Sequence, residues 1–391
     1  MQTEKTKKII LFITDAGGGH RASAASLKAA AEALKLPWDI RIVNIYREVW
    51  NHSEPLKKAF GFYAEDTYNF VLKNNLQIWT GLMRKAARFS ASLPQRAARK
   101  ALADFLALEK PHLCVSLIPF VNDVLADCHQ EAGVPLGLVC TDLMDVKPFM
   151  WYTPRLCAGA RFVSAPSPGA AEQAAGAGVG KRIVKSGLLI HRKYFSRENR
   201  MLGPAMARLR FELDEELYTV AILMGGYGSK LIEEFVMRLE RSRSRLQVVA
   251  CYGKNEALGL RLEKMRPKLK NKLVPLGFSG QLPALMRASD LLVSKPGPAA
   301  LMEGLAMNVP MVLDDVDTLP QERPNVAWAV EQGVAIGLKR RKDILAVVER
   351  FMMDPSLATA MRERQSQNMP MDAAWPLLEA MESCLSNSTA S

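Results

Sequence analysis

Two hydrophobic patterns alternate along the first half of the chain. Short continuous apolar runs are separated by longer stretches in which apolar residues recur every three or four positions. The first pattern predicts strands that are buried on both faces, and the second predicts the helices that cover them. The predicted strands span residues 9–14, 40–45, 113–117, 136–141, 161–165 and 183–186.

The second half repeats this alternation, with predicted strands over residues 218–224, 246–252, 273–275, 291–294, 310–313 and 335–338. Strands that alternate with helices favour parallel sheets. The sequence therefore predicts an α/β protein with two Rossmann-like parallel-sheet domains facing a cleft, over residues 1–195 and 205–365. A helical pattern over 366–391 is expected to pack back on the first domain.

One segment, from about residue 53 to 110, has no strand pattern. Its apolar residues follow helical spacing on a face that includes Trp79, and residues 47–110 hold eleven Lys or Arg against six Asp or Glu. An apolar stripe with Trp beside basic residues is typical of a helix on an anionic bilayer, with Trp79, Arg84, Lys85 and Arg88 as candidate contacts. An amphipathic helix packed on the core is the alternative.

Composition and charge narrow the class of protein. A chain of 391 residues with 49% hydrophobic and 24% charged residues is globular. Its net charge of +12 favours anionic partners, whether nucleotides, nucleic acid or a bilayer. Six cysteines without a CxxC pair indicate reduced thiols, and no apolar run reaches the roughly 20 residues of a membrane span. We therefore expect a cytoplasmic protein whose membrane contact is peripheral.

A glycine turn ends the first predicted strand, at Asp15-Ala16-Gly17-Gly18-Gly19-His20. Glycines let the backbone approach a phosphate or a sugar, and the following helix begins with free N–H groups. A neutral histidine is suited to accept a proton near pH 7. His20 is therefore a candidate base, and Asp15 either orients its imidazole or caps the turn.

Two strand–glycine–helix segments of the second half are candidate phosphate sites. Gly225, Gly226 and Gly228 follow one predicted strand, without the GK[ST] ending of a P-loop. Lys295, Gly297 and Pro298 follow another, and the N–H groups of Ala299 and Ala300 begin the next helix. Glu303, one turn further on, can accept both hydroxyls of a ribose, or is a first-turn glutamate favoured by the helix dipole.

A polar loop at residues 319–325 carries Gln321, Glu322 and Asn325. Amide and carboxylate side chains on one loop can bind several sugar hydroxyls, although such a loop can also cap a helix. Asp315 and Asp317 precede it, but no metal is expected there, because the helix N-termini already supply positive charge.

These segments together resemble a GT-B glycosyltransferase, and more specifically the monogalactosyldiacylglycerol synthase and diacylglycerol glycosyltransferase relatives of glycosyltransferase family 28. The resemblance is carried by residues 15–24, 277–303 and 320–325, with Thr141-Asp142-Leu143 and Gly253-Lys254-Asn255. The chain departs from that pattern at Ala299 and Ala300, where a Ser or Thr is common, and at Lys147, where a His is common.

The resemblance implies a role for each candidate residue. His20 would be the catalytic base, and Gly19 of the glycine turn would bind the donor. Phe278 would lie at the uracil, Glu303 at the ribose, and Gln321, Glu322 and Asn325 at the hexose. The diphosphate would be surrounded by Gly225, Gly226, Gly228, Lys295, Gly297, Pro298, Ala299 and Ala300.

The predicted activity is that of a 1,2-diacylglycerol 3-beta-galactosyltransferase-like enzyme, an inverting hexosyltransferase acting at the inner face of the cell membrane. UDP-galactose or UDP-glucose would be the co-substrate, without a cofactor, and nucleic acid is not an expected partner because no recognition motif accompanies the basic residues. Two alternatives remain: transfer to another lipid-linked or secondary-metabolite acceptor, and a non-catalytic lipid- or nucleotide-binding relative.

Overall fold

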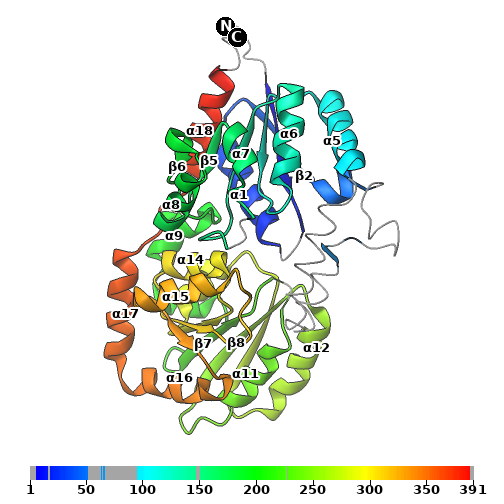
Figure 1. Ribbon diagram of the computed structural model, residues 1–391. Helices are drawn as coiled ribbons and strands as arrows, with labels where there is room; N and C mark the ends of the chain where they lie inside the picture. Colours follow the sequence, from blue (N-terminus) through cyan, green and yellow to red (C-terminus); the bar gives the residue numbers. More distant parts are fainter. Residues whose placement is uncertain are drawn as a thin grey trace. The chain divides into compact units, whose positions relative to one another are not determined.

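The computed structural model describes residues 6–15, 18–51, 63, 65–66, 95–146, 150–226 and 228–387. By the contacts among these residues the chain divides into two compact units (Figure 1). Unit 1 takes in the described residues up to Arg192 and those from Met371 onward, and unit 2 is Lys193–Pro370.

Unit 1 contains a parallel sheet of six strands in the order β2-β1-β3-β4-β5-β6. The strands are β1 Lys7–Ile13, β2 Trp38–Asn44, β3 Leu113–Ser116, β4 Leu136–Leu138, β5 Phe162–Ser164 and β6 Ile183–Val184. The described helices are α1 Gly19–Ala33, α5 Gln95–Glu109, α6 Asn122–Ala132, α7 Pro154–Gly159, α8 Pro168–Gly176 and α18 Ala374–Asn387, and the short π-helix η1 spans Ile45–Val49.

Unit 2 contains a second parallel sheet of six strands, in the order β12-β11-β10-β7-β8-β9. The strands are β7 Tyr218–Leu223, β8 Leu246–Gly253, β9 Lys272–Gly277, β10 Leu291–Ser294, β11 Met311–Asp314 and β12 Ile336–Leu338. The helices are α9 Arg197–Met201, α10 Pro204–Leu209, α11 Leu231–Leu239, α12 Glu256–Met265, α13 Leu282–Ala288, α14 Pro298–Ala306, α15 Arg323–Glu331, α16 Ile344–Met353 and α17 Pro355–Gln367. The short 3₁₀ helices of unit 2 are η5 Arg266–Lys268 and η6 Arg341–Asp343, whereas η3 Gly180–Arg182 belongs to unit 1 and η4 Arg192–Phe195 crosses the boundary between the units. The predicted pair of doubly wound parallel sheets is confirmed.

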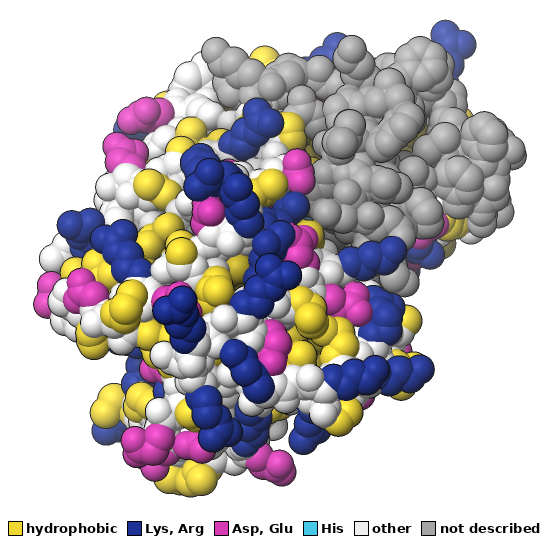
Figure 2. Space-filling view, turned by 90° about the horizontal axis from the view of Figure 1, so that it is seen from below, with side chains coloured by type: hydrophobic (Ala, Val, Ile, Leu, Met, Phe, Trp, Pro, Cys, Tyr) yellow, Lys and Arg dark blue, Asp and Glu magenta, His cyan; other side chains and the backbone are white. Residues whose placement is uncertain are grey.

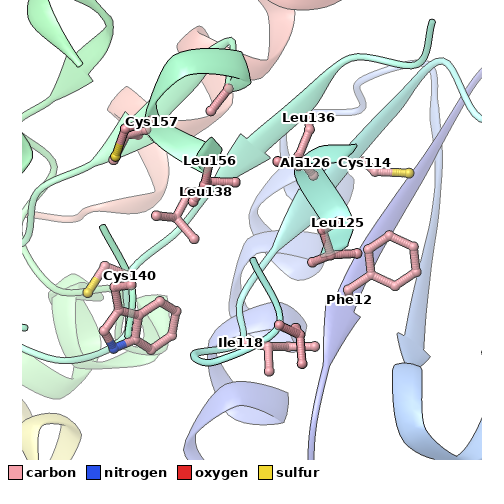
Figure 3. Close-up of a cluster of buried hydrophobic side chains, with 14 of the residues drawn as sticks. Phe12, Cys114, Ile118, Leu125, Ala126, Leu136, Leu138, Cys140, Leu156 and Cys157 are labelled. Atoms are coloured by element: carbon pink, nitrogen blue, oxygen red, sulfur yellow. The ribbon is translucent and has the colours of Figure 1, made fainter. Parts of the chain in front are cut away.

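Strand β1 shows why continuous apolar runs become central strands. Ile9, Leu11 and Ile13 face one buried cluster, while Ile10 and Phe12 face the other. Successive side chains of a strand point to opposite faces, so both faces of this strand must be apolar. Phe12 packs in the cluster drawn in Figure 3, with Leu125 and Leu138 among its members.

The chain returns to unit 1 at its C-terminal end. Helix α18, red in Figure 1, lies beside β5 and β6 of unit 1. Leu377, Met381 and Leu385 are buried in the same cluster as Leu27 of α1. The guanidinium of Arg192 also contacts the carboxylate of Asp372 at 2.8 Å. This ion pair joins the end of the first part of unit 1 to the segment that begins at Met371.

Two predicted features concern the membrane. Trp79, Arg84, Lys85 and Arg88 lie outside the described residues, as does most of the segment that carries them. Within the described part of the chain, no helix is both long and apolar enough to cross a bilayer. Lys and Arg side chains are spread over the face shown in Figure 2, with acidic and hydrophobic side chains between them.

Candidate active site

The glycine turn of unit 1 joins β1 to α1, as the sequence predicts. Gly18 is the N-cap of α1, with φ of 80°, a left-handed conformation that glycine adopts without a steric penalty. Gly19 is exposed, and a Cβ at this position would meet nothing within 4 Å. Ala16 and Gly17 lie outside the described residues. The first turn of α1 thus presents its N–H groups and His20 at the carboxyl end of β1.

His20 is held by a second segment of unit 1. Its Nδ1 lies 3.0 Å from Oγ1 of Thr141. Its ring centroid lies 5.9 Å from that of Trp151, with the planes tilted by 47°. Strand β4 ends at Leu138, so Thr141 lies in the loop that follows this strand. Thr141, one of the residues at 141–143 that carry the resemblance, therefore contacts the glycine turn.

The imidazole of His20 is neutral at physiological pH. Although the residue is partly exposed, desolvation of the ring lowers its pKa to about 4, against the opposing effects of a hydrogen bond to the Leu117 backbone and of the negative charge on Asp15. A neutral imidazole keeps a lone pair with which to accept a proton. The structure thus places a neutral, oriented imidazole at the position where the sequence predicts a base.

Asp15 contacts several polar side chains around the turn. Its carboxylate accepts hydrogen bonds from Nε and Nη2 of Arg21, at 2.6 and 2.9 Å, and from Nδ2 of Asn44 at 2.9 Å. The bond from Arg21 is the main reason that the pKa of Asp15 is lowered. Asp15 therefore stays ionised, and its charge acts on His20.

A buried carboxylate, Glu65, supports the start of this turn. Its oxygens accept hydrogen bonds from Oγ1 of Thr14 and the backbone N–H of Asp15, each at 2.8 Å, and from Nδ2 of Asn44 at 3.1 Å. Nε of Arg47 lies 2.5 Å from it, and the Glu65 side chain is only 1% exposed. Sequence reasoning missed Glu65, because a lone glutamate fifty residues away carries no local signal.

We expect Glu65→Gln to destabilise unit 1 by about 1–3 kcal/mol, because an amide nitrogen would then face donors that now point at a carboxylate oxygen. Asp66→Asn is the matched control: Asp66 also contacts Arg47, but its side chain is 40% exposed, so the cost should stay below about 1 kcal/mol. Chemical denaturation of both variants measures the difference. Equal unfolding free energies would contradict the supporting role of Glu65.

The loop that carries Trp151 is itself fixed by a buried carboxylate. Asp145 accepts hydrogen bonds from the backbone N–H groups of Met150, Trp151 and Tyr152, at 3.0, 2.7 and 3.0 Å. Nε1 of Trp151 donates to Asp142 at 2.8 Å. Lys147, which departs from the family pattern, lies outside the described residues. The ring beside His20 is therefore held at both its backbone and its indole nitrogen.

The first glycine segment of unit 2 follows β7 and touches the end of β8. Gly225 and Gly228 have φ of 85° and 62°, and Gly226 is exposed. The carbonyl of Gly226 accepts from the N–H of Lys254 at 2.9 Å. A Cβ on Gly253, whose φ is 59°, would lie 2.3 Å from that carbonyl oxygen. Two loops at the carboxyl ends of neighbouring strands thus pack backbone against backbone.

Gly253→Ala is expected to lower the stability of unit 2 by at least about 2 kcal/mol, through left-handed strain and the contact with Gly226. Gly280→Ala is the control, since a Cβ there meets nothing within 4 Å and no left-handed φ is involved. Thermal unfolding compares the two variants. If Gly253→Ala unfolds at the same temperature as the wild type, the close approach of Gly253 to the Gly226 carbonyl is not required for stability.

Lys295, Gly297 and Glu322 meet beside Gly225. Nζ of Lys295 lies 3.5 Å from Oε1 of Glu322, and a Cβ on Gly225 would lie 3.2 Å from Cε of the lysine. Gly297 is the N-cap of α14 without a side-chain cap, and Pro298 is its first residue, so the N–H groups of Ala299 and Ala300 begin a helix. The structure therefore groups a cation and a helix N-terminus with the glycine segment.

Glu303 lies further along α14 and is the most perturbed carboxylate of this region. Burial raises its pKa to about 7, opposed by the Tyr194 hydroxyl and by the charge on Lys193. Perturbed carboxylates of this kind are common at functional sites. Tyr194 and Lys193 belong to the stretch that sequence reasoning treated only as a linker.

The remaining predicted donor residues have different surroundings. Phe278 is 70% exposed directly after β9, and Nζ of Lys254 lies 4.8 Å from its ring centroid. Gln321 is partly buried, and Glu322 is 8% exposed. Asn325 is 1% exposed and its Nδ2 donates to the Pro296 carbonyl at 2.8 Å, so its amide supports the loop before α14.

The two aspartates that precede this loop are paired with basic side chains. Asp315 contacts Lys339, and Asp317 lies 3.3 Å from Arg341. Arg341 also contacts the buried Asp314 at 2.9 Å. In the described ranges, no three His, Cys, Asp or Glu side chains are grouped in a way that could hold a metal ion.

Several known proteins are similar to this chain in sequence. Residues 219–370 match the family model of the glycosyltransferase family 28 C-terminal domain. Monogalactosyldiacylglycerol synthase 2 of Arabidopsis thaliana is 27% identical over 386 residues, covering 93% of this chain and 77% of that protein. Probable monogalactosyldiacylglycerol synthase 3 of Oryza sativa subsp. japonica is 26% identical, covering 89% and 68%.

Among solved structures, MurG of Acinetobacter baumannii has a TM-score of 0.62 at 12% identity, covering 96% of this chain and 99% of its own. The UDP-GlcNAc 2-epimerase of Neisseria meningitidis, bound to UDP-GlcNAc, has a TM-score of 0.62 at 14% identity, covering 97% and 100%. These likenesses show the fold alone. The chain therefore has the GT-B fold, matches the glycosyltransferase family 28 C-terminal domain over residues 219–370, and resembles the monogalactosyldiacylglycerol synthases along most of its length.

Proposed function

We propose that this protein is a glycosyltransferase that moves a hexose from a UDP-sugar to the hydroxyl of diacylglycerol at a membrane surface. The observation that carries the proposal is His20, a neutral imidazole held by Thr141 at the start of α1. The names of the relatives, which are monogalactosyldiacylglycerol synthases, support the choice of a lipid acceptor.

In the proposed reaction His20 takes the proton of the acceptor hydroxyl while that oxygen attacks the anomeric carbon of the hexose. The bond from the anomeric carbon to the diphosphate oxygen breaks, and its electron pair leaves with UDP. A single displacement inverts the anomeric configuration. The negative charge of Asp15 favours the imidazolium that forms, because it raises the affinity of His20 for the proton.

In the proposed donor site the leaving diphosphate is stabilised by the positive charges of unit 2. Lys295 and the N-terminus of α14 lie beside the Gly225 segment. Backbone N–H groups and a lysine directed at developing negative charge lower the barrier to its departure. No metal is part of the proposal, since these groups supply the positive charge.

Membrane attachment is proposed through the basic segment of residues 47–110. Trp79, Arg84, Lys85 and Arg88 are proposed to contact an anionic bilayer, on the basis of their sequence pattern. The net charge of +12 favours such a surface. We propose a peripheral location on the inner face of the cell membrane.

At saturating UDP-hexose, the acid limb of kcat should lie well below the pKa of an ordinary histidine. Only neutral His20 accepts a proton, so the base is lost as pH falls through its pKa of about 4, and not through the ordinary histidine value of 6.5. NMR titration of the ring, assigned with His20→Asn, measures this midpoint beside the pH profile of kcat at saturating UDP-hexose, where ionisation of the donor-binding Glu303 does not limit the rate. A midpoint near 6.5 would contradict the desolvated site.

Acceptor assays test the function and its alternatives. Anionic liposomes that contain diacylglycerol, a lipid-linked cell-wall precursor or neither are incubated with UDP-galactose or UDP-glucose, and the lipids are analysed. The proposal predicts a hexosyl lipid only with diacylglycerol. If a hexosyl lipid forms only with the lipid-linked cell-wall precursor, that lipid and not diacylglycerol is the acceptor. If the protein binds UDP but forms no product, it is a non-catalytic relative.

A further inference from the structure

Phe120, in the loop that follows β3, has a backbone conformation that a bulky side chain rarely adopts. Its φ is 72°, in the left-handed region where a side chain crowds the backbone. Of the six non-glycine residues with positive φ in the described chain, Phe120 alone is apolar. Glycine would take this conformation without strain, so the presence of a phenyl ring calls for a reason.

The hydrophobic core does not supply that reason. Ile118 and Val121, on either side of Phe120, are 1% and 3% exposed and belong to the buried cluster drawn in Figure 3. Phe120 itself is partly exposed and is not a member of that cluster. Its ring therefore remains accessible at the carboxyl end of the sheet, where α/β proteins bind their ligands.

The loop that carries Phe120 is fixed to the surroundings of His20. The N–H of Phe120 donates to the Met150 carbonyl at 3.1 Å. Asn122 is fully buried, and its Nδ2 donates to the carbonyls of Met150 and Trp151 at 3.4 and 3.3 Å. The Trp151 ring lies beside that of His20. Hydrogen bonds therefore join the Phe120 loop to the segment that contacts the proposed base.

We propose that Phe120 is an acceptor-binding residue, and that its ring contacts the apolar part of the hydroxyl acceptor bound at His20. An aromatic ring offers a large apolar surface, and a loop that is already fixed loses little conformational entropy when the ligand binds. Such a contact favours an acceptor with alkyl chains over a small polar alcohol. The inference rests on the proposed function, because His20 is the base of that reaction.

Transfer from UDP-galactose or UDP-glucose to a water-soluble, short-chain diacylglycerol tests this contact in the full chain. Phe120→Asn removes the ring and introduces a residue that tolerates the left-handed conformation. Phe120→Tyr keeps the ring. Lys35→Asn is the matched control, since Lys35 is exposed and has a φ of 55° just beyond the far end of α1. The length of that helix separates it from His20 by about 20 Å.

Phe120→Asn should raise the KM for diacylglycerol about tenfold, the loss expected when part of an aromatic contact with an apolar ligand is removed. Its kcat should change less than about threefold, because such a contact is made equally in the ground state and the transition state. Relief of backbone strain offsets the lost ring, so its melting temperature should stay within about 3 °C of the wild type. Phe120→Tyr and Lys35→Asn should keep the wild-type KM, and the UDP affinity of all three variants should be unchanged.

If Phe120→Asn keeps the wild-type KM for diacylglycerol, the inference is overturned while the proposed function stands. If Phe120→Asn also weakens UDP binding, or if Lys35→Asn raises the KM as much, the effect belongs to the fold and the inference is likewise overturned. If the wild-type chain forms no hexosyl diacylglycerol, the proposed function fails, and the inference fails with it.

Discussion

His20→Ala is expected to lower turnover by about 10²- to 10⁴-fold, the usual loss when a general base is removed. The reason is the geometry in unit 1, where Thr141 holds Nδ1 and Trp151 lies against the ring. UDP affinity should change little, because the candidate donor residues other than Gly19 belong to unit 2. Turnover on diacylglycerol liposomes and calorimetry with UDP measure the two effects separately.

His191→Ala is the control for this substitution. His191 is exposed and belongs to the same unit, so its loss should leave turnover within about twofold of the wild type, as expected for a surface substitution. If His20→Ala retained near-full turnover, the base would be another group and the proposed mechanism would be wrong.

Glu303→Ala is expected to weaken UDP binding by about 10- to 100-fold. A carboxylate that accepts two hydroxyl donors contributes about 1.5–3 kcal/mol through hydrogen bonds to a charged group. Desolvation raises the pKa of this partly buried carboxyl group to about 7, and hydrogen bonds to a carboxylate are stronger in surroundings of low polarity. The dissociation constant of UDP for both proteins gives the magnitude.

A UDP analogue without its two ribose hydroxyls makes this test specific. The analogue should bind the wild type about as weakly as UDP binds Glu303→Ala, and the variant should bind both ligands alike. Such a cycle isolates the pairwise contact from other effects of the substitution. If the wild-type protein binds UDP and the analogue equally well, Glu303 does not bind the ribose hydroxyls.

Features set by local pattern could be predicted from the sequence. The apolar runs placed the strands, because a strand buried on both faces, such as β1, needs continuous hydrophobic residues. The glycine turn before α1 was also predictable, since Gly18 occupies a left-handed conformation that few other residues adopt. Strand ends were less accurate: β4 stops at Leu138, and the next residues lead to Thr141.

Features that depend on contacts between distant segments could not be predicted. Glu65 lies fifty residues from Asp15, whose N–H it accepts, and neither position has a pattern that implies the other. Nδ2 of Asn325 donates to the Pro296 carbonyl, a contact between two loops that no local pattern implies.

The anomeric configuration of the product tests the central claim most directly. Diacylglycerol liposomes are incubated with α-linked UDP-hexose, the lipid is isolated, and its anomeric proton coupling is measured by NMR while UDP release is counted. The account predicts one β-linked hexosyl diacylglycerol for each UDP released. An α-linked glycolipid, or UDP release without glycolipid, would contradict direct transfer with His20 as the base.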